Sequence, residues 1–231
     1  MRYRVAALFL LLLAAPALAA KKAPPPPVEI NVHWKSGTVT YQTSPTGQSE
    51  QVTGVHVVAR DAYVTTGPAS SGLLVYPETS RIAIGQNTTV QVGQFEAKGQ
   101  AFFTSLRLPA TGGAVRFDVH HKEDGESSYV FQTQLATVTV RGTSALLSDG
   151  ISGDTLMCLV CEAGDVVARL RGRDYALLSG ETMRIAPSGH VTIEKTSEAV
   201  VQTFALTGLS TEMPPPEPKP TPRRIHIKIK L

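Results

Sequence analysis

The stretch LATVTVRGTSALLSDG, residues 135–150, contains the clearest alternation in the chain. Ala136, Val138 and Val140 stand at every second position with threonines between them, which is the period of a β-strand with one buried face. The alternation stops at Arg141 and Gly142. Glycine accepts backbone conformations that a residue with a Cβ resists, so the chain is expected to turn a corner here. The stretch therefore predicts a buried strand that ends in a bend.

Similar short runs recur along the chain, each bounded by glycine, proline, serine or aspartate. They are VEINVHW, SRIAIG, TTVQVG, AVRFDVH, SYVFQT, ATVTVR, LMCLVC, DVVARL and HVTIEK. No window of 12 or more residues after the N-terminal run has helical periodicity. The sequence thus predicts an all-β fold: a single domain of many short strands, in roll-like or solenoid-like stacked sheets, with helix of at most a turn or two.

The N-terminus has the pattern of a secretory signal peptide. Arg2 and Arg4 precede an apolar run over residues 5–15, and the small-residue triplet at 17–19 follows. The run is shorter than the roughly 20 residues that span a bilayer. We therefore expect a signal peptide over residues 1–19, cleaved after Ala19, and a periplasmic or secreted protein that does not span the membrane.

Two proline-rich segments, residues 20–27 and 214–222, bracket the predicted domain at residues 28–213. Residues 223–231, RRIHIKIKL, follow the second segment and alternate again. Their apolar side chains belong to Ile225, Ile227, Ile229 and Leu231. We expect these four residues to bind as an edge strand to this domain or to a partner. The alternative is a solvated basic tail.

The charge of the chain argues against one class of partner. The whole sequence has a net charge of +3, but residues 28–213 hold 13 basic and 18 acidic side chains, a net charge of −5. A domain that binds nucleic acid presents a basic face. We therefore expect no nucleic acid among its partners.

Cys158 and Cys161 are the only cysteines. In a regular strand their Cα atoms would lie about 10 Å apart, beyond the limit of about 7 Å for a disulfide. This spacing predicts structural thiols rather than a redox pair. A bulge or turn at Leu159 and Val160 would make a bridge possible.

The sequence gives little indication of a metal site or of a catalytic site. Asp118 and His120 would share one face of a strand, but two ligands do not make a metal site. The sequence holds no phosphate loop, dinucleotide fingerprint or nucleophile elbow. We therefore expect no metal, no cofactor and no catalytic residues, so the protein is not expected to be an enzyme.

The stretch QTQLATVTVRGTSALLS, residues 132–148, resembles the central signature of the FecR domain, and its flanks extend the resemblance over about residues 52–192. The signature positions are Val140, Arg141, Gly142 and Thr143. We expect them to be structural: Gly142 supplies the bend, Thr143 binds nearby backbone, and Arg141 clamps the corner. The alternative for Arg141 is contact with a partner.

The resemblance also carries expectations about function. The best-known FecR proteins are inner-membrane regulators with a cytoplasmic anti-sigma region and one membrane span, and this sequence shows neither. It resembles the exported β module alone. We therefore expect a module that binds another cell-envelope component, protein or glycan, in envelope signalling. The alternatives are a structural or assembly factor of the envelope and, if acids or histidines converge in a deep pocket, a hydrolase.

Overall fold

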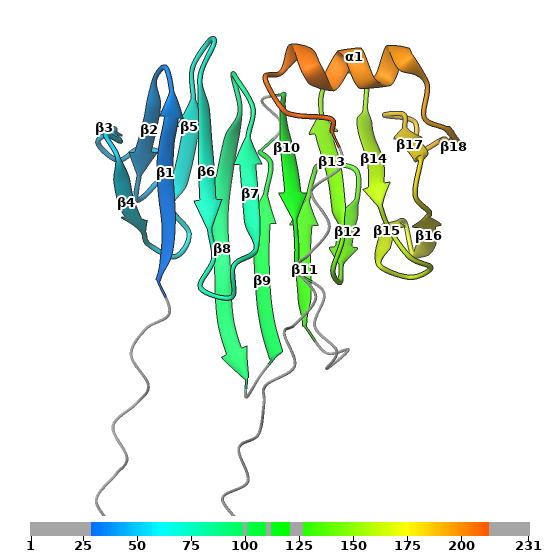
Figure 1. Cartoon of the computed structure of the whole chain (residues 1–231), viewed down its shortest axis with the longest axis horizontal. Helices are drawn as coiled ribbons and strands as arrows, with labels where there is room; N and C mark the ends of the chain where they lie inside the picture. The colour runs from blue at the N-terminus through cyan, green and yellow to red at the C-terminus, as the bar shows by residue number, and fades with distance from the viewer. Residues whose placement is uncertain (1–28, 99–100, 110–111, 121–126, 213–231) are drawn as a thin grey trace, which may run out of the picture.

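The computed structural model describes residues 29–98, 101–109, 112–120 and 127–212. These residues form two nine-stranded β-sheets stacked in two layers (Figure 1). The predicted signal peptide, both proline-rich segments and the C-terminal segment lie outside the described residues, so the predicted boundaries at residues 19, 28 and 213 stay predictions. Within the described ranges, no helix is long and apolar enough to cross a membrane.

Each sheet runs from an edge formed by N-terminal strands to an edge formed by C-terminal strands. In that order, the first sheet contains β4 (Val55–Val58), β1 (Ile30–Ser36), β6 (Ser71–Val75), β7 (Arg81–Ile84), β10 (Gly113–Asp118), β13 (Ser144–Asp149), β14 (Asp154–Val160), β17 (Glu181–Ile185) and β18 (Val191–Lys195). The second sheet contains β3 (Glu50–Gln51), β2 (Val39–Gln42), β5 (Tyr63–Thr66), β8 (Thr89–Lys98), β9 (Ala101–Arg107), β11 (Ser128–Gln132), β12 (Thr137–Val140), β15 (Val166–Leu170) and β16 (Arg173–Leu177).

Strand order across each sheet follows the sequence closely, because the chain passes back and forth between the layers as it advances sideways. Neighbouring strands are antiparallel, except that β9 and β11 run parallel. All nine runs expected to be strands lie on strands, namely β1, β7, β8, β10, β11, β12, β14, β15 and β18. The prediction of an all-β fold of many short strands in stacked sheets is confirmed.

The core is one contiguous apolar cluster between the two sheets. Alternation produces it, because every second side chain of a strand points to the same face. Val138 and Val140 of the signature strand are buried in this cluster. The rings of Phe117 on β10 and Phe131 on β11 stack across the two layers with centroids 4.4 Å apart.

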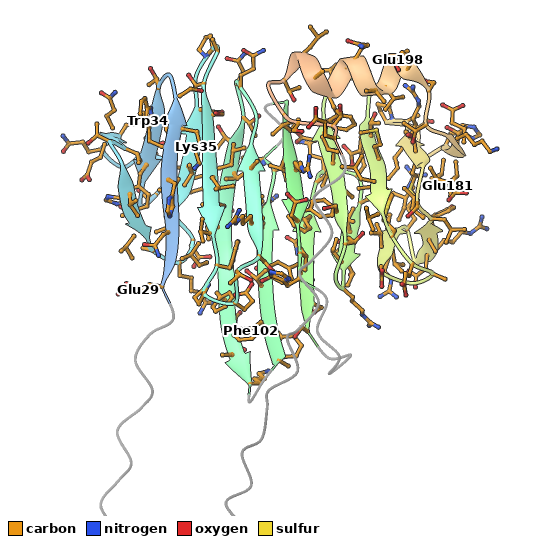
Figure 2. The ribbon with its side chains drawn as sticks, in the orientation of Figure 1. Glu29, Trp34, Lys35, Phe102, Glu181 and Glu198 are labelled. Carbon is orange, nitrogen blue, oxygen red and sulfur yellow. A yellow bond between two sulfur atoms is a disulfide. The ribbon has the colours of Figure 1, made fainter. Side chains whose placement is uncertain are left out.

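One helix, α1 (Glu198–Leu206), follows the last strand of the described chain. Its nine residues make about two and a half turns, slightly more than the turn or two expected. Val200 and Phe204 are four positions apart, so they share a face and are the two buried residues of the helix. Glu198 marks its start near β17, and the helix runs back toward the middle of the first sheet (Figures 1 and 2).

Candidate functional site

The candidate site is the outer face of the first sheet, which faces away from the second sheet. On β4, the ring of His56 contacts Tyr41 of the second sheet with centroids 4.5 Å apart, so His56 points inward. Its neighbours Val55 and Val57 must then point outward, because side chains alternate along a strand. This assignment fixes which residues form the outer face on each neighbouring strand through the strand register.

Half of this face is covered by the chain itself. Val200 and Phe204 of α1 pack on the outward side chains of Ala114, Leu146 and Met157 from β10, β13 and β14. This second apolar cluster explains why consecutive residues are buried on β10 and β13, which are covered on both faces. Residues 207–212, here called the C-terminal arm, continue from α1 across the same face.

The arm and the end of α1 are held by polar groups of Gln86, in the turn after β7, and of Arg116 on β10. Gln86, which follows β7, donates its backbone N–H to the carbonyl of Thr207 at 2.8 Å and its side-chain amide to that of Leu206 at 2.6 Å. Leu209 of the arm is buried in the cluster beneath α1. The apolar and polar contacts together fix the path of the arm over β7 and β10.

Arg116 on β10 is the strongest anchor of the arm. Its Nη1 donates hydrogen bonds of 2.9 Å to the carbonyl oxygens of Ser210 and Glu212. Its Nε and Nη2 donate to the carboxylate of Asp118 at 3.0 to 3.2 Å, and the Ser144 hydroxyl donates to the same carboxylate. A planar guanidinium serves these partners at once because its donors form a rigid fork.

Arg116 is only 7% exposed, so these partners must compensate its buried positive charge for the loss of contact with water. Sequence reasoning missed this residue. The signal that could have found it is a basic residue between two apolar ones in AVRFDVH, with an aspartate two positions later on the same face. The pairing also answers the hypothesis about Asp118 and His120: the carboxylate of Asp118 binds Arg116. No group of three possible metal ligands gathers within the described residues.

The other half of the outer face is open. It comprises the outward side chains of β4, β1 and β6: Val55, Val57, Asn31, His33, Leu73 and Val75. Val55 and Val57 are 61% and 48% exposed, and the other four are half-buried. We call this set the open patch. Leu73 joins the patch to the covered half, because its neighbour Ala83 packs against the cluster beneath α1.

The family-signature residues lie far from the open patch, at the corner between β12 and β13. Val140 is in the core, and Gly142 has a φ of +108°, so the predicted bend at this glycine is present. Thr143 is buried and donates its hydroxyl proton to the carbonyl of Val160. The exposed Arg141 donates its backbone N–H to the carbonyl of Asp165 at 2.9 Å.

The same corner holds a disulfide between Cys158 and Cys161, whose Cα atoms are 6.2 Å apart. The expectation of separate thiols in a regular strand is therefore wrong. Ser144 pairs with Val160 but Ala145 pairs with Cys158, so the strand carries a bulge at Leu159. The extra residue shortens the strand locally and brings the two cysteines within bonding range.

A buried acidic pair flanks the turn between β13 and β14, because Asp149 ends β13 and Asp154 begins β14. Asp149 and Asp154 are 8% and 3% exposed. Burial raises the pKa of Asp154 to about 6; a hydrogen bond from Thr133 opposes the shift and the nearby Asp149 adds to it. Burial also raises the pKa of Asp149. Both carboxyl groups are too enclosed to meet a solute without local opening.

The remaining predicted site residues, Ile225, Ile227, Ile229 and Leu231, lie outside the described residues. Their role as a docking strand stays a prediction. The features of the outer face that the structure adds are Arg116, the C-terminal arm and the open patch.

Part of this chain matches a known protein family. Residues 62–167, which include the signature corner, match the model of the FecR protein family. The resemblance predicted from the sequence is thereby confirmed over these residues. No protein of curated function matches the sequence.

Two crystal structures of a candidate anti-sigma factor from Parabacteroides distasonis ATCC 8503, at 1.65 and 2.50 Å resolution, share the fold. Each has a TM-score of 0.50 and 12% sequence identity over 62% of this chain. The match covers 64% and 63% of the respective solved chains, which is less than two thirds of their length. At this identity the likeness concerns the fold alone.

Proposed function

We propose that this protein, which carries a FecR-type domain at residues 62–167, is a non-enzymatic module of the bacterial cell envelope that binds another envelope component through its open patch. The FecR match supports a regulatory role in envelope signalling rather than a catalytic one. The partner is a protein rather than a glycan, because the patch is formed mainly by aliphatic side chains.

The open patch is the observation that carries this proposal. Contiguous exposed apolar surface on a folded domain marks an interaction site more often than scattered exposed residues do. Val55 and Val57 stand two positions apart on β4, Leu73 and Val75 lie on β6, and Asn31 and His33 of β1 lie between these two aliphatic pairs. The covered half of the same face shows the kind of contact the sheet makes, because α1 binds there through aliphatic and aromatic side chains.

Export to the periplasm or the outside of the cell belongs to the same proposal. The disulfide between Cys158 and Cys161 supports it, because such bonds persist in oxidising compartments. The signal-peptide pattern of residues 1–19 supports it independently. N-terminal sequencing of the protein from the envelope fraction tests it: a mature chain beginning after Ala19 is expected, and an intact Met1 would refute export by this route.

We also propose that the protein is not a catalyst, and the burial of its two acidic residues supports this. Among the described residues, Asp154 and Asp149 are the carboxyl groups whose pKa is raised by burial, and both are buried. Acid and base catalysts need access to their substrate. The enclosed pair instead makes the stability of the fold depend on pH.

The binding proposal is tested with charge substitutions in the open patch. Val55→Glu and Val57→Glu place carboxylates on exposed positions, so the fold should persist while an apolar interface is lost. The matched control is Ile151→Glu, because Ile151 is 101% exposed in the turn between β13 and β14. Each variant is used to capture proteins from envelope extracts. A partner lost with the two valine variants and kept with the control supports the proposal.

The same capture experiment, repeated with cells from different growth conditions, separates a regulator from a structural factor. A regulator binds its partner under some growth conditions only, whereas an assembly factor fractionates with the same envelope material under all of them. A protein captured equally by all three variants would show that the open patch is not the binding surface.

A further inference from the structure

β4 is the last strand of the first sheet on the N-terminal side, and no other described strand pairs with its outer edge. The N–H of Trp34 donates to the carbonyl of Gly54 at 2.7 Å, so this pair is a hydrogen-bonded one. Hydrogen-bonded pairs alternate along an antiparallel ladder, which makes Val55 and Val57 members of non-bonded pairs. Their backbone N–H and C=O groups therefore point away from β1, toward the free edge.

The edge strand β4 is short, but it carries neither lysine nor proline, and no described strand covers it. Exposed edge strands commonly carry lysine or proline, or are covered by another segment, because a bare edge pairs with other chains. β4 has the sequence VHVV, and the backbone groups of Val55 and Val57 have no hydrogen-bond partner in the part of the chain that the structure describes. The edge is thus open to one more strand.

An acidic side chain of the second sheet lies opposite the position at which such a strand would be added. Tyr41 on β2 contacts His56 on β4, and Glu50 on β3 is the cross-strand partner of Tyr41. Glu50 therefore shares the inner face of the second sheet with Tyr41 and lies one strand further out. A strand added beside β4 would sit opposite Glu50, whose side chain is exposed. Basic side chains suit the inner side of that strand.

The chain beyond the arm is long enough to reach this edge. The described chain ends at Glu212, whose carbonyl is bound to Arg116 on β10. From β10 to a position beyond β4 is five strand spacings across the sheet, which is roughly 24 Å at about 4.8 Å each. Residues 213–224 are proline-rich and can extend to about 37 Å at about 3.1 Å per residue. The available length exceeds the distance.

We propose that residues 225–231, IHIKIKL, bind to the free edge of β4 as an additional strand of the first sheet. The isoleucines lie on the outer face beside Val55 and Val57, and Lys228 and Lys230 lie on the inner side toward Glu50. Main-chain hydrogen bonds to β4 supply much of the affinity, and the side-chain pattern sets the face. The strand extends and partly covers the open patch.

This inference deepens the proposed function, because a segment bound at β4 occupies part of the surface offered to the partner. Partner binding then requires that the segment be displaced or that it form part of the joint surface. The docking itself concerns the protein alone, so it can be tested without any partner. A failure to dock would leave partner binding to the open patch untouched.

The test is disulfide cross-linking in the purified full chain. Val57→Cys is combined in turn with a cysteine at each position from 225 to 230, and the native cysteines stay bridged to each other. Val57 is 48% exposed, so the fold should tolerate the substitution. We expect at least one of Ile225→Cys, Ile227→Cys and Ile229→Cys to bridge at least fivefold more within one molecule than any of His226→Cys, Lys228→Cys and Lys230→Cys.

Three results would overturn the docking. Equal bridging at isoleucine and lysine positions would show a tethered segment without a defined face. Stronger bridging at the lysine positions would reverse the proposed face. Bridges that form only between molecules and increase with protein concentration would show that the segment binds a second copy instead.

A second measurement uses amide hydrogen exchange and needs no cysteine. The backbone N–H groups of Val55 and Val57 should exchange at least tenfold faster when residues 223–231 are deleted. A full-length variant with Ile225, Ile227 and Ile229 changed to serine should show the same acceleration. Glu50→Lys should also accelerate exchange, whereas the matched change Glu162→Lys, at an exposed site near β14 and β15, should not. Unchanged exchange in the deletion variant would contradict the proposal.

Discussion

Arg116 donates a hydrogen bond of 2.9 Å to the backbone carbonyl of Glu212, which lies 96 residues further along the chain. The contact joins the central strand β10 to the last described residue. It closes a path in which the chain runs out to β18, turns through α1 and returns to the middle of the sheet.

Arg116→Lys should release the C-terminal arm. A lysine ammonium is a single point of charge and cannot bind Asp118 and two carbonyl oxygens together. We expect the free energy of unfolding to fall by about 1 to 3 kcal/mol, together with faster amide exchange over residues 207–212. Arg173→Lys on the exposed strand β16 is the matched control and should change neither quantity. If both variants behave alike, Arg116 does not anchor the arm.

Asp154→Asn should stabilise the protein at neutral pH. Burial raises the pKa of Asp154 to about 6 from an ordinary value of 3.8. Between these values the folded state keeps a proton that the unfolded state has released, so wild-type stability falls as pH rises and stays reduced above pH 6. We expect the variant to gain about 1 to 3 kcal/mol at about pH 7 and much less at about pH 3.5.

Chemical unfolding of both proteins between about pH 3.5 and about pH 7 checks this sign. Asp149, whose pKa burial also raises, should leave a smaller slope of the same sign in the variant. A variant that loses stability equally at both pH values would show that the carboxylate of Asp154 is needed in its charged form.

Reduction of the disulfide should lower stability without unfolding the domain. The bridge closes a loop with a sequence separation of three, so its effect on the unfolded state is small, about 2 kcal/mol. We expect a lower Tm in reductant and in the variant with Cys158→Ser and Cys161→Ser. Reductant should not affect that variant. Mass spectrometry checks the bond directly: a native mass matching two free thiols would disprove it.

Gly153→Ala should destabilise the protein more than Gly164→Ala. Both glycines have positive φ, +116° and +90°, so both substitutions strain the backbone. A Cβ at Gly153 would also overlap the carbonyl oxygen of Ile185, whereas a Cβ at Gly164 meets nothing within 4 Å. We expect a loss of about 1 to 2 kcal/mol at Gly164 and more than about 3 kcal/mol at Gly153. Equal losses would indicate that the turn between β13 and β14 shifts easily to accommodate a Cβ at Gly153.

The sequence predicts the sheets well because alternation is a local property. Val138 and Val140 stand two apart, and that spacing suffices to place them on one face in the core. The bend at Gly142 is equally local. The bulge at Leu159 is different, because it depends on how Ser144 and Ala145 pair with β14. No spacing within LMCLVC reveals that pairing, so the disulfide could only be left as an alternative.

The candidate surface is harder to predict than the fold. Phe204 and Val200 form too short a stripe to indicate a helix in a 12-residue window, and their burial depends on β10 and β13 lying beneath them. Arg116 is recognisable only when the arm that it binds is in place. The open patch exists because α1 covers the other half of the sheet, which is a property of the assembled layers.

The return of the chain to β10 also determines how the protein bears a mechanical load applied beyond Glu212. The last strands, β17 and β18, lie at the side of the sheet and could be peeled away one ladder bond at a time if the pull reached them first. The arm directs the force instead to Arg116, near the middle of the layer, where several bonds must break together. A load applied at this end is therefore borne by the centre of the sheet and not by its edge strands.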